Sequence, residues 1–171
     1  MKHEPQASRP HMPGYGIYEP TQGKGLLPWS WATERLERSH NYWLATTRPD
    51  GSPHAMAVWG MWIDDRFYFS TGGDSRKARN LAANARCVVT TESGAQAVIV
   101  EGTARETAFA DLPEGIAATY QAKYATALDP QLGPIFVVTP HTAFAFIEVG
   151  DAPDEFVSTA TRWQFAAASA S

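Results

Sequence analysis

The spacing of apolar residues changes along the chain, and each change predicts a different kind of element. Between Trp29 and Leu36 apolar side chains recur every three or four residues, which predicts a short helix over residues 28–38 that begins at a proline. Further on, short β-branched and aromatic runs alternate with turns rich in Gly, Pro and Asp, which predicts strands. The expected strands are residues 42–48, 53–63, 66–70, 86–92, 97–106, 136–138 and 143–149, with two more helices at 75–84 and about 109–127.

This order of elements predicts a mainly β fold with flanking helices. Closing an antiparallel meander into a small barrel removes its exposed edges. The chain length fits one such domain, which we place at residues 28–165. Residues 1–27 carry several Pro and Gly without periodicity and are expected to be an extended N-terminal arm, mobile or laid along a partner surface. Residues 166–171, rich in alanine and serine, are expected to be a disordered tail.

The strand predicted at residues 53–63 is apolar on both faces. Its odd-numbered positions from 55 to 63 are all apolar, as a barrel interior requires, and its even-numbered positions from 54 to 62 are nearly as apolar. The second face cannot simply face water, so a helix, another subunit or a flat ligand should cover it. Gly60 in this strand allows close approach of whatever lies there. Together with the six tryptophans of the chain, this strand predicts an obligate dimer.

A candidate phosphate site follows the strand at residues 66–70. Two glycines come after this strand, and the next helix carries Arg76 and Lys77 in its first turn. The N–H groups there have no intrahelical partner, and the helix dipole adds partial positive charge. Asp74 is a natural N-cap for this helix, with Ser75 at the first helical position.

The same helix also has a simpler interpretation. Ala78, Leu81 and Ala82 share one face and can pack against the barrel, while Arg76 and Asn80 should look outward. An ordinary capped surface helix with two exposed cations has this pattern too. Spacing alone therefore leaves both interpretations open.

Composition limits the class of protein. A hydrophobic share of 44%, a charged share of 19% and a net charge of -4 describe a soluble globular protein without the electrostatic footprint of nucleic-acid binding. Any anionic ligand must then be held by a local site. Cys87, the only cysteine, is expected to be a buried strand residue. The N-terminus lacks the apolar stretch of a signal peptide and no run reaches transmembrane length, so a cytoplasmic protein without a membrane partner is expected.

Four segments resemble the pyridoxamine 5'-phosphate oxidase-like split β-barrel superfamily in order and spacing. They are residues 44–54 (LATTRPDGSPH), 67–73 (FYFSTGG), 75–81 (SRKARNL) and 100–104 (VEGTA). Within the superfamily, residues 70–73 before a Lys-containing helix and residues 120–124 (YQAKY) are more similar to the flavin/deazaflavin oxidoreductase branch. That branch includes enzymes that use coenzyme F420, among them biliverdin-reductase-like members. The resemblance covers about residues 30–149 and implies a split β-barrel.

The resemblance implies a homodimeric oxidoreductase with two cofactor sites at the subunit interface. A phosphorylated flavin or deazaflavin would bind there and transfer hydride to a small organic acceptor. Its phosphate is expected at Ser75, Arg76 and Lys77, with Ser70 and Thr71 beside the ring. Beneath the ring the resemblance implies Met56, Ala57, Val58, Trp59, Gly60 and Met61. Arg162 and Trp163 occupy a C-terminal position where the family often supplies cofactor contacts from the partner subunit.

Two departures separate this chain from true pyridoxamine-phosphate oxidases. Those enzymes carry an Arg and a Lys on the second strand, where this chain has Met56 and Met61, and their C-terminal His and Arg pattern is not evident. Vitamin B6 oxidation is therefore not expected. No catalytic side chain is identified, since an acceptor can stack on the ring and take its proton from solvent.

The choice between F420 and FMN depends on local positive charge. F420 carries a long anionic tail, and Arg76, Lys77 and Arg79 fall within one helical turn, with Arg86 at the next strand. FMN, with one phosphate, needs fewer cations. We therefore place F420 narrowly ahead of FMN.

Two other classes of function stay open. A haem-binding or haem-degrading split barrel would need an axial ligand, and His54 or His141 would have to serve. A non-catalytic flavin-binding module is the other. The five histidines show no metal-ligand spacing, so no metal site is expected, and His54 is expected to be structural.

Overall fold

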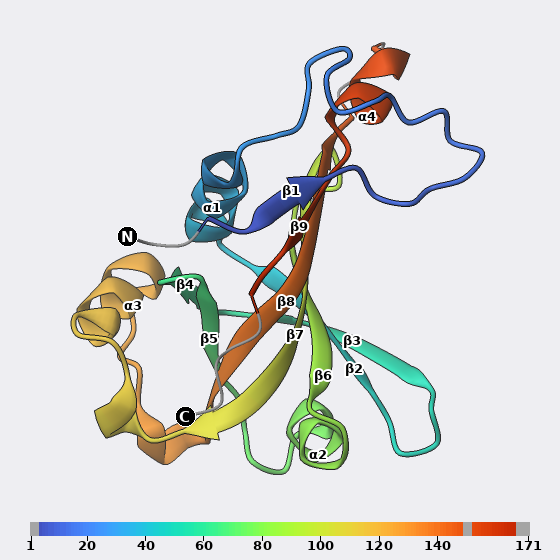
Figure 1. Cartoon of the computed structure of the whole chain (residues 1–171). Helices are drawn as coiled ribbons and strands as arrows, with labels where there is room; N and C mark the ends of the chain where they lie inside the picture. The colour runs from blue at the N-terminus through green and yellow to red at the C-terminus, as the bar shows by residue number, and fades with distance from the viewer. Residues whose placement is uncertain (1–3, 149–151, 167–171) are drawn as a thin grey trace.

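The computed structural model describes residues 4–148 and 152–166, and strands dominate within them. Antiparallel strands join in the order β1-β9-β8-β7-β6-β2-β3, while β5 pairs with β8 and β4 (Figure 1). The strands are β1 (Gln6–Ser8), β2 (Tyr42–Thr47), β3 (Pro53–Val58), β4 (Met61–Ile63), β5 (Arg66–Ser70), β6 (Arg86–Thr91), β7 (Gln96–Thr107), β8 (Ile135–Ile147) and β9 (Thr161–Gln164). The helices are α1 (Trp29–Arg38), α2 (Arg76–Ala83), α3 (Ile116–Tyr124) and α4 (Pro153–Thr159), with 3-10 turns at Phe109–Asp111 and Pro130–Leu132. The mainly β architecture with flanking helices is confirmed.

The long strand β8 divides the sheet into two parts. Along its whole length it pairs with β7, but on its other edge its first residues pair with β5 and its later residues with β9. The sequence predicts two strands here, and the structure shows one. Pro140, which lacks an N–H group, lies opposite Gly102 at a register shift between β7 and β8, where the ladder tolerates a missing donor. The predicted end at residue 149 lies outside the described residues.

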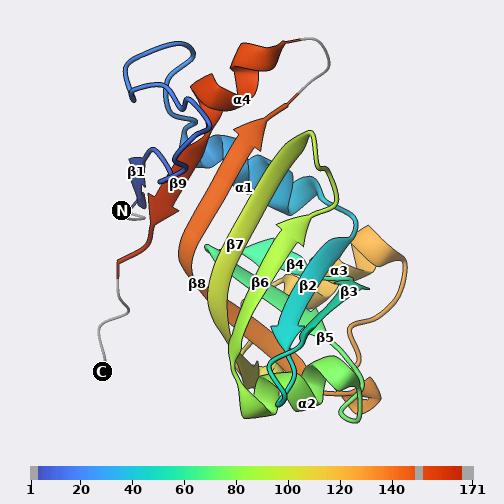
Figure 2. The ribbon, with the colours of Figure 1, turned by 90° about the vertical axis from the view of Figure 1, so that its right-hand side faces the viewer.

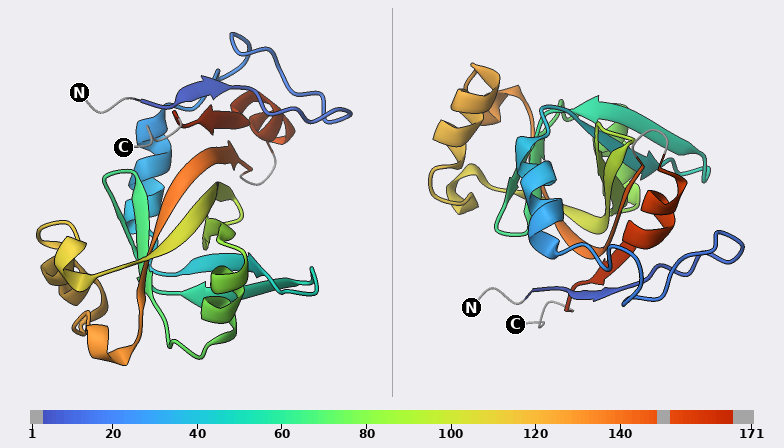
Figure 3. Two further views of the ribbon diagram at one scale, coloured as in Figure 1. Left: turned by 60° about the horizontal axis from the view of Figure 1, so that its bottom comes forward. Right: turned by 90° about the horizontal axis from the view of Figure 1, so that it is seen from above.

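Two apolar clusters lie on opposite faces of β4, β5 and the first part of β8. Successive residues of a strand point to opposite faces, and here both faces are buried. Trp62, Phe67 and Val138 enter the barrel core, while their neighbours Met61 and Tyr68 pack outside it under α3. Helix α1 lies across one end of the barrel, and α3 stands outside its wall (Figure 3).

The opposite wall of the barrel is bare. Figure 2 looks onto the outer face of β3, β2, β6, β7 and β8, and no helix of the described chain crosses the middle of that face. Cross-strand neighbours make a row of mostly apolar side chains over it, and Trp43 in that row is 50% exposed. The row consists of Ala57, Trp43, Thr90, Ile99 and Phe144. We call this surface the bare sheet face.

The strand predicted at residues 53–63 is two strands, β3 and β4, broken at Trp59 and Gly60. A Cβ at Gly60 would lie 2.2 Å from Cζ of Phe67, so the chain can pass this ring only because residue 60 has no side chain. The prediction that the odd-numbered positions face the interior is wrong. Tyr42, which is fully buried, lies opposite the buried Val58, so Val58 faces inward and Ala57 faces solvent.

Two further predictions need correction, and one element was missed. The helix predicted over residues 109–127 is a 3-10 turn followed by α3, because Pro113 and Gly115 (φ 80°) interrupt it. The sequence pattern missed α4. Part of the N-terminal arm, β1, pairs with β9 of the same chain, with Ala7 opposite Trp163. In the described residues no helix is long and apolar enough to span a membrane.

Candidate functional site

Helix α2 begins at the end of β5, after the two-glycine turn. Its N-cap is Ser75, whose Oγ accepts a hydrogen bond from the N–H of Ala78 at 3.2 Å. The prediction of Asp74 as N-cap is therefore wrong by one residue, and Ser75 has the extended backbone that a cap requires. The hydroxyl of Thr71 lies 3.2 Å from Oγ of Ser75 and joins the cap to the end of β5. By helix geometry, the N–H groups of Arg76 and Lys77 have no intrahelical acceptor.

A groove of about 380 Å³ lies between the start of α2, the end of β3 and α3. Six residues predicted to contact the cofactor line it: Ala57, Val58, Trp59, Ser70, Thr71 and Lys77. Two lining residues were missed by the sequence reasoning, Asn41 and Tyr120. Tyr120 lies four residues before Tyr124 on one helix, so the pair spacing in YQAKY could have directed attention to this helix face.

The other predicted residues do not line this groove. Ser75 and Arg76 are close to it in sequence as the cap and first residue of α2, and Arg76 is exposed. Met56 is 51% exposed on β3, Gly60 is buried in the break, and Met61 is buried beyond it. Arg162 lies on β9 between Ser8 and Phe144.

Trp163 belongs to the core. Its side chain is 1% exposed, and its ring lies 5.2 Å from that of Trp29, edge to face. A ring buried in this way has no free surface for a ligand. The structure thus gives Trp163 a packing role in place of the expected cofactor contact.

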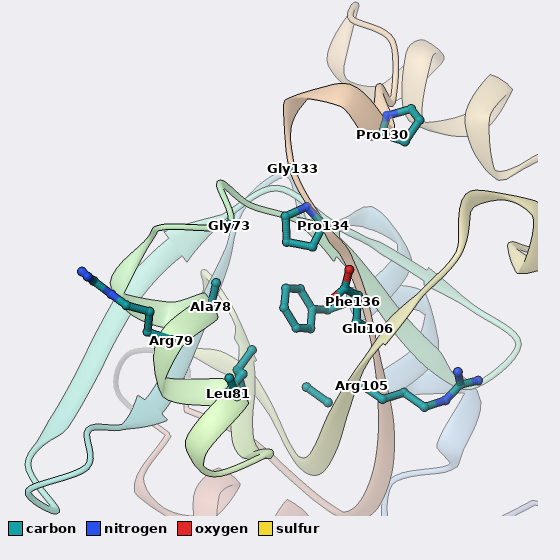
Figure 4. A pocket seen from close by; sticks show the side chains of 12 residues that line it. Gly73, Ala78, Arg79, Leu81, Arg105, Glu106, Pro130, Gly133, Pro134 and Phe136 are labelled. Atoms are coloured by element: carbon teal, nitrogen blue, oxygen red, sulfur yellow. The ribbon is translucent and has the colours of Figure 1, made fainter.

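Lys77 and Arg79 of α2 do not share one hollow. Lys77 lines the groove, whereas Arg79 lines a larger hollow of about 660 Å³ on the other side of the helix. Figure 4 shows this second hollow, where Phe136 and Pro134 form an apolar wall and the Arg79 and Arg105 side chains extend away from it. Residues two positions apart on a helix, such as Lys77 and Arg79, point in nearly opposite directions. The expected single cluster of positive charge is therefore divided.

Asn80 corrects another expectation. The sequence pattern places it outward, but it is fully buried, and its Nδ2 donates to Oγ1 of Thr46 on β2 at 3.0 Å. This contact anchors α2 to the barrel through a side-chain hydrogen bond. It fixes the face of the helix that turns Lys77 toward the groove.

A polar cluster from α3 holds the break between β3 and β4. The N–H of Gly60 donates to the Tyr124 hydroxyl at 2.9 Å, and that hydroxyl lies 2.8 Å from the carbonyl oxygens of Gly60 and His40, to which it can donate. Nζ of Lys123 donates to the Gly60 carbonyl at 3.1 Å and to the Tyr42 hydroxyl at 2.9 Å. Burial lowers the pKa of Lys123 to about 8 and raises the pKa of Tyr124 to about 12.

The remaining candidate residues lie away from the groove. Burial raises the pKa of the Cys87 thiol to about 12, in keeping with a buried strand residue and against a nucleophile. Nδ1 of His54 lies 3.5 Å from Oγ1 of Thr46, and His141 is exposed, with Nε2 3.1 Å from Oγ1 of Thr103. Neither histidine lines the groove.

Residues 32–148 match the family model described as pyridoxamine 5'-phosphate oxidase. The chain belongs to this family. The matched segment begins in α1 and ends just after β8, so it includes every residue that lines the groove. The resemblance read from the sequence motifs and the split-barrel fold are thereby confirmed.

Solved structures of several functions share the fold. An F420 reductase is 26% identical, with a TM-score of 0.52 over 64% of this chain and 93% of that chain. An FAD-binding protein from Mesorhizobium loti is 17% identical, with a TM-score of 0.53 over 80% and 94% of the two chains. The heme storage protein HutZ from Vibrio cholerae is 16% identical, with a TM-score of 0.56 over 70% and 93%. At these identities the last two show the fold alone. No curated protein matches the chain.

Proposed function

We propose that this protein is an oxidoreductase that binds a phosphorylated flavin or deazaflavin in the groove and transfers hydride to a small organic acceptor. One observation carries the proposal: Lys77 and Thr71, at the start of α2, line the same hollow as Ala57 and Trp59 at the end of β3. An anionic group and a flat apolar ring are the two parts of such a cofactor. The groove offers a partner for each part.

The residues present fit an anion at the start of α2. The Ser75 side chain already caps Ala78, which leaves the N–H groups of Arg76 and Lys77 for an external acceptor. The half-buried Lys77 side chain adds a full positive charge beside them. A protein with a net charge of -4 holds an anion only through such a local arrangement.

When bound, the flavin or deazaflavin supplies the hydride chemistry. The residues of the chain bind and orient it: the start of α2 fixes the anionic end, and Ala57 and Trp59 shield one side from water. Tyr120 faces the same groove, and within the described residues its hydroxyl makes no hydrogen bond. It is free to donate a hydrogen bond to a bound acceptor.

We further propose that the functional unit is a homodimer. The bare sheet face exposes Trp43, and the exposed edge strand β3 carries Met56 and Ala57 beside the groove. Contiguous apolar surface of this kind on a soluble protein is typical of an interaction site. A second copy packed there would bury the row and enclose the open side of the groove.

For the cofactor, F420 stays narrowly ahead of FMN in this proposal. The similarity to an F420 reductase at 26% identity favours it. The division of Lys77 and Arg79 between two hollows weakens the argument from clustered charge. A haem-binding function is not favoured by any groove-lining residue, because His54 and His141 both lie elsewhere.

The test is a titration of the purified protein with FMN and with F420, at low and at moderate salt. F420 should bind more tightly and lose more affinity as salt rises, because its tail carries more charge. Tighter FMN binding would reverse the order of the two cofactors. Binding of neither would defeat the proposal, and a Soret band on titration with haem would select the alternative. Oxidation of the reduced, protein-bound cofactor by the quinone menadione, followed by absorbance, separates an enzyme from a non-catalytic module.

A further inference from the structure

The break between β3 and β4 is held by side chains from a helix that is distant in sequence. Nζ of Lys123 donates to the carbonyl oxygens of Gly60 (3.1 Å) and Glu37 (3.4 Å) and to the Tyr42 hydroxyl (2.9 Å). The Tyr42 hydroxyl in turn donates to the carbonyl of Leu36. One lysine of α3 thus joins the end of α1, β2 and the break in a single hydrogen-bonded unit.

Trp59 connects this unit to the groove. It is the residue before Gly60, it is 44% exposed, and it lines the groove. Its ring stacks on Tyr124 with centroids 4.7 Å apart and planes 13° from parallel. The orientation of this groove wall therefore depends on the backbone at Gly60 and on the Tyr124 ring beneath it.

The surroundings of Lys123 argue against a role in packing alone. Within the described residues it has no carboxylate in ion-pair contact, and its hydrogen-bond acceptors are all neutral. Its ammonium also lies over the rings of Tyr42 (4.8 Å) and Tyr124 (5.3 Å). Burial of an unpaired cation disfavours folding, and an apolar side chain would fill the same space without that penalty. An apolar side chain could not donate the hydrogen bond to the Gly60 carbonyl, which is the specific contribution of the ammonium.

We propose that Lys123 is a positioning residue, which holds the carbonyl of Gly60 and so keeps the Trp59 ring in place as the wall of the groove. The effect on cofactor binding rests on the proposed function. The effect on Trp59 does not, because it is present in the protein without any ligand.

The first test compares Lys123→Met, which keeps the chain length but removes the donors, with Lys123→Arg, which keeps a cation. Lys24→Met is the matched control, because Lys24 pairs with Glu155 far from the groove. The fluorescence of Trp59 is obtained as the difference between each protein and the same protein carrying Trp59→Phe. In Lys123→Met this emission should shift to longer wavelength, and FMN and F420 should each bind about three- to tenfold more weakly. Lys123→Arg should retain the wild-type Trp59 emission and cofactor affinities, and Lys24→Met should change neither of them.

The second test is the pH profile of the Trp59 signal in the ligand-free protein. Burial lowers the pKa of Lys123 from 10.5 to about 8, so its charge is lost near pH 8 in the folded protein. The neutral amine is the weaker donor, so the Trp59 emission should shift with a midpoint near pH 8. Lys123→Arg, whose guanidinium stays charged, and Lys123→Met should both lack this step.

Other ionisable groups face Lys123, and the variants separate them from it. They are Glu37 and His40 at the end of α1, Tyr42 on β2, Glu92 after β6, and Tyr120 and Tyr124 on α3. Burial raises the pKa of all three tyrosines, so they titrate well above Lys123. A step near pH 8 that persists in Lys123→Arg belongs to another of these groups and overturns the proposal.

If Lys123→Met does not fold, Tyr124→Phe provides a second route. It removes the hydroxyl that contacts Gly60 while the ring under Trp59 remains, so the Trp59 emission should still shift to longer wavelength. An unchanged Trp59 signal in Lys123→Met, or in Tyr124→Phe when Lys123→Met is unfolded, overturns the proposal. Failure of wild type to bind FMN and F420 would instead defeat only the proposed function.

Discussion

Strands β3 and β4 come from one apolar run of sequence, yet β4 is buried and most of β3 is exposed. In β4, Met61 and Trp62 are each 4% exposed, one under α3 and the other in the barrel core. In β3, Met56 is 51% exposed, and Ala55 and Ala57 are exposed as well. Two similar segments of sequence therefore differ in whether the chain itself covers them.

The difference lies in what packs against each strand. β4 pairs with β5 and has α3 on one face and the core on the other. β3 pairs only with β2 and forms the edge of the sheet, so one of its faces joins the bare sheet face. An apolar strand without cover within its own chain favours cover from outside, by a ligand or a second subunit. The candidate groove begins where the covered segment gives way to the uncovered one.

The largest expected effect comes from truncating a core side chain of the covered segment, β4. Trp62→Ala removes a core ring that packs edge to face on Trp29 at 6.1 Å, and should lower the free energy of unfolding by about 3–5 kcal/mol. Trp59→Ala, its matched control in the uncovered segment, should cost about 1 kcal/mol. Urea unfolding followed by circular dichroism, at one protein concentration, measures both. Equal losses would contradict the comparison.

A charge on the uncovered segment should prevent association. Ala57→Glu places carboxylates on the proposed interface, where like charges of the two copies meet at a cost of several kcal/mol. Light scattering at micromolar concentration should find the wild type as a dimer and this variant as a monomer. Ala117→Glu, on the exposed surface of α3, is the control and should remain dimeric. A monomeric wild type would remove the dimer from the proposed function.

The break between the two segments should tolerate no side chain. In Gly60→Ala the new Cβ would lie 2.2 Å from Phe67 and 2.7 Å from the carbonyl oxygen of Tyr68, so the core must shift. Overpacking of this kind costs about 1–3 kcal/mol of stability. Gly72→Ala has no atom within 4 Å of its new Cβ and should cost much less. A Gly60→Ala protein as stable as Gly72→Ala would show that the core around Gly60 can accommodate a side chain.

The last expected effect, similar in size to that at Gly60 but on binding instead of stability, concerns the anion partner beside the uncovered segment. Lys77→Ala should weaken FMN and F420 binding about tenfold or more, because a charge-assisted hydrogen bond contributes roughly 1.5–3 kcal/mol. Arg79→Ala is the control on the other side of α2 and should bind both cofactors as the wild type does. Fluorescence titration measures the dissociation constants. Unchanged affinity in Lys77→Ala, or equal losses in both variants, would exclude Lys77 as the anion partner.

Local pattern determined much of this protein. Turn residues and apolar periodicity located α1, β2, β5 and α2 to within one or two residues, because these elements are set by caps and turns close in sequence. The order of the motifs identified the family, which the match over residues 32–148 confirms. Six residues of the groove were also predicted, through the family resemblance as a whole, and three of them lie in the motifs at residues 67–73 and 75–81.

Only the tertiary structure decided which apolar surfaces are covered. Periodicity could not orient residues 53–63, because both faces are apolar; the fully buried Tyr42 opposite Val58 decided it. The joining of two predicted strands into β8 required Pro140 to fall at the register shift against β7, which only the pairing of the two strands reveals. The place of Lys123 beside Gly60 depends on α3 folding back over β4, a contact between residues 63 positions apart that no local pattern records.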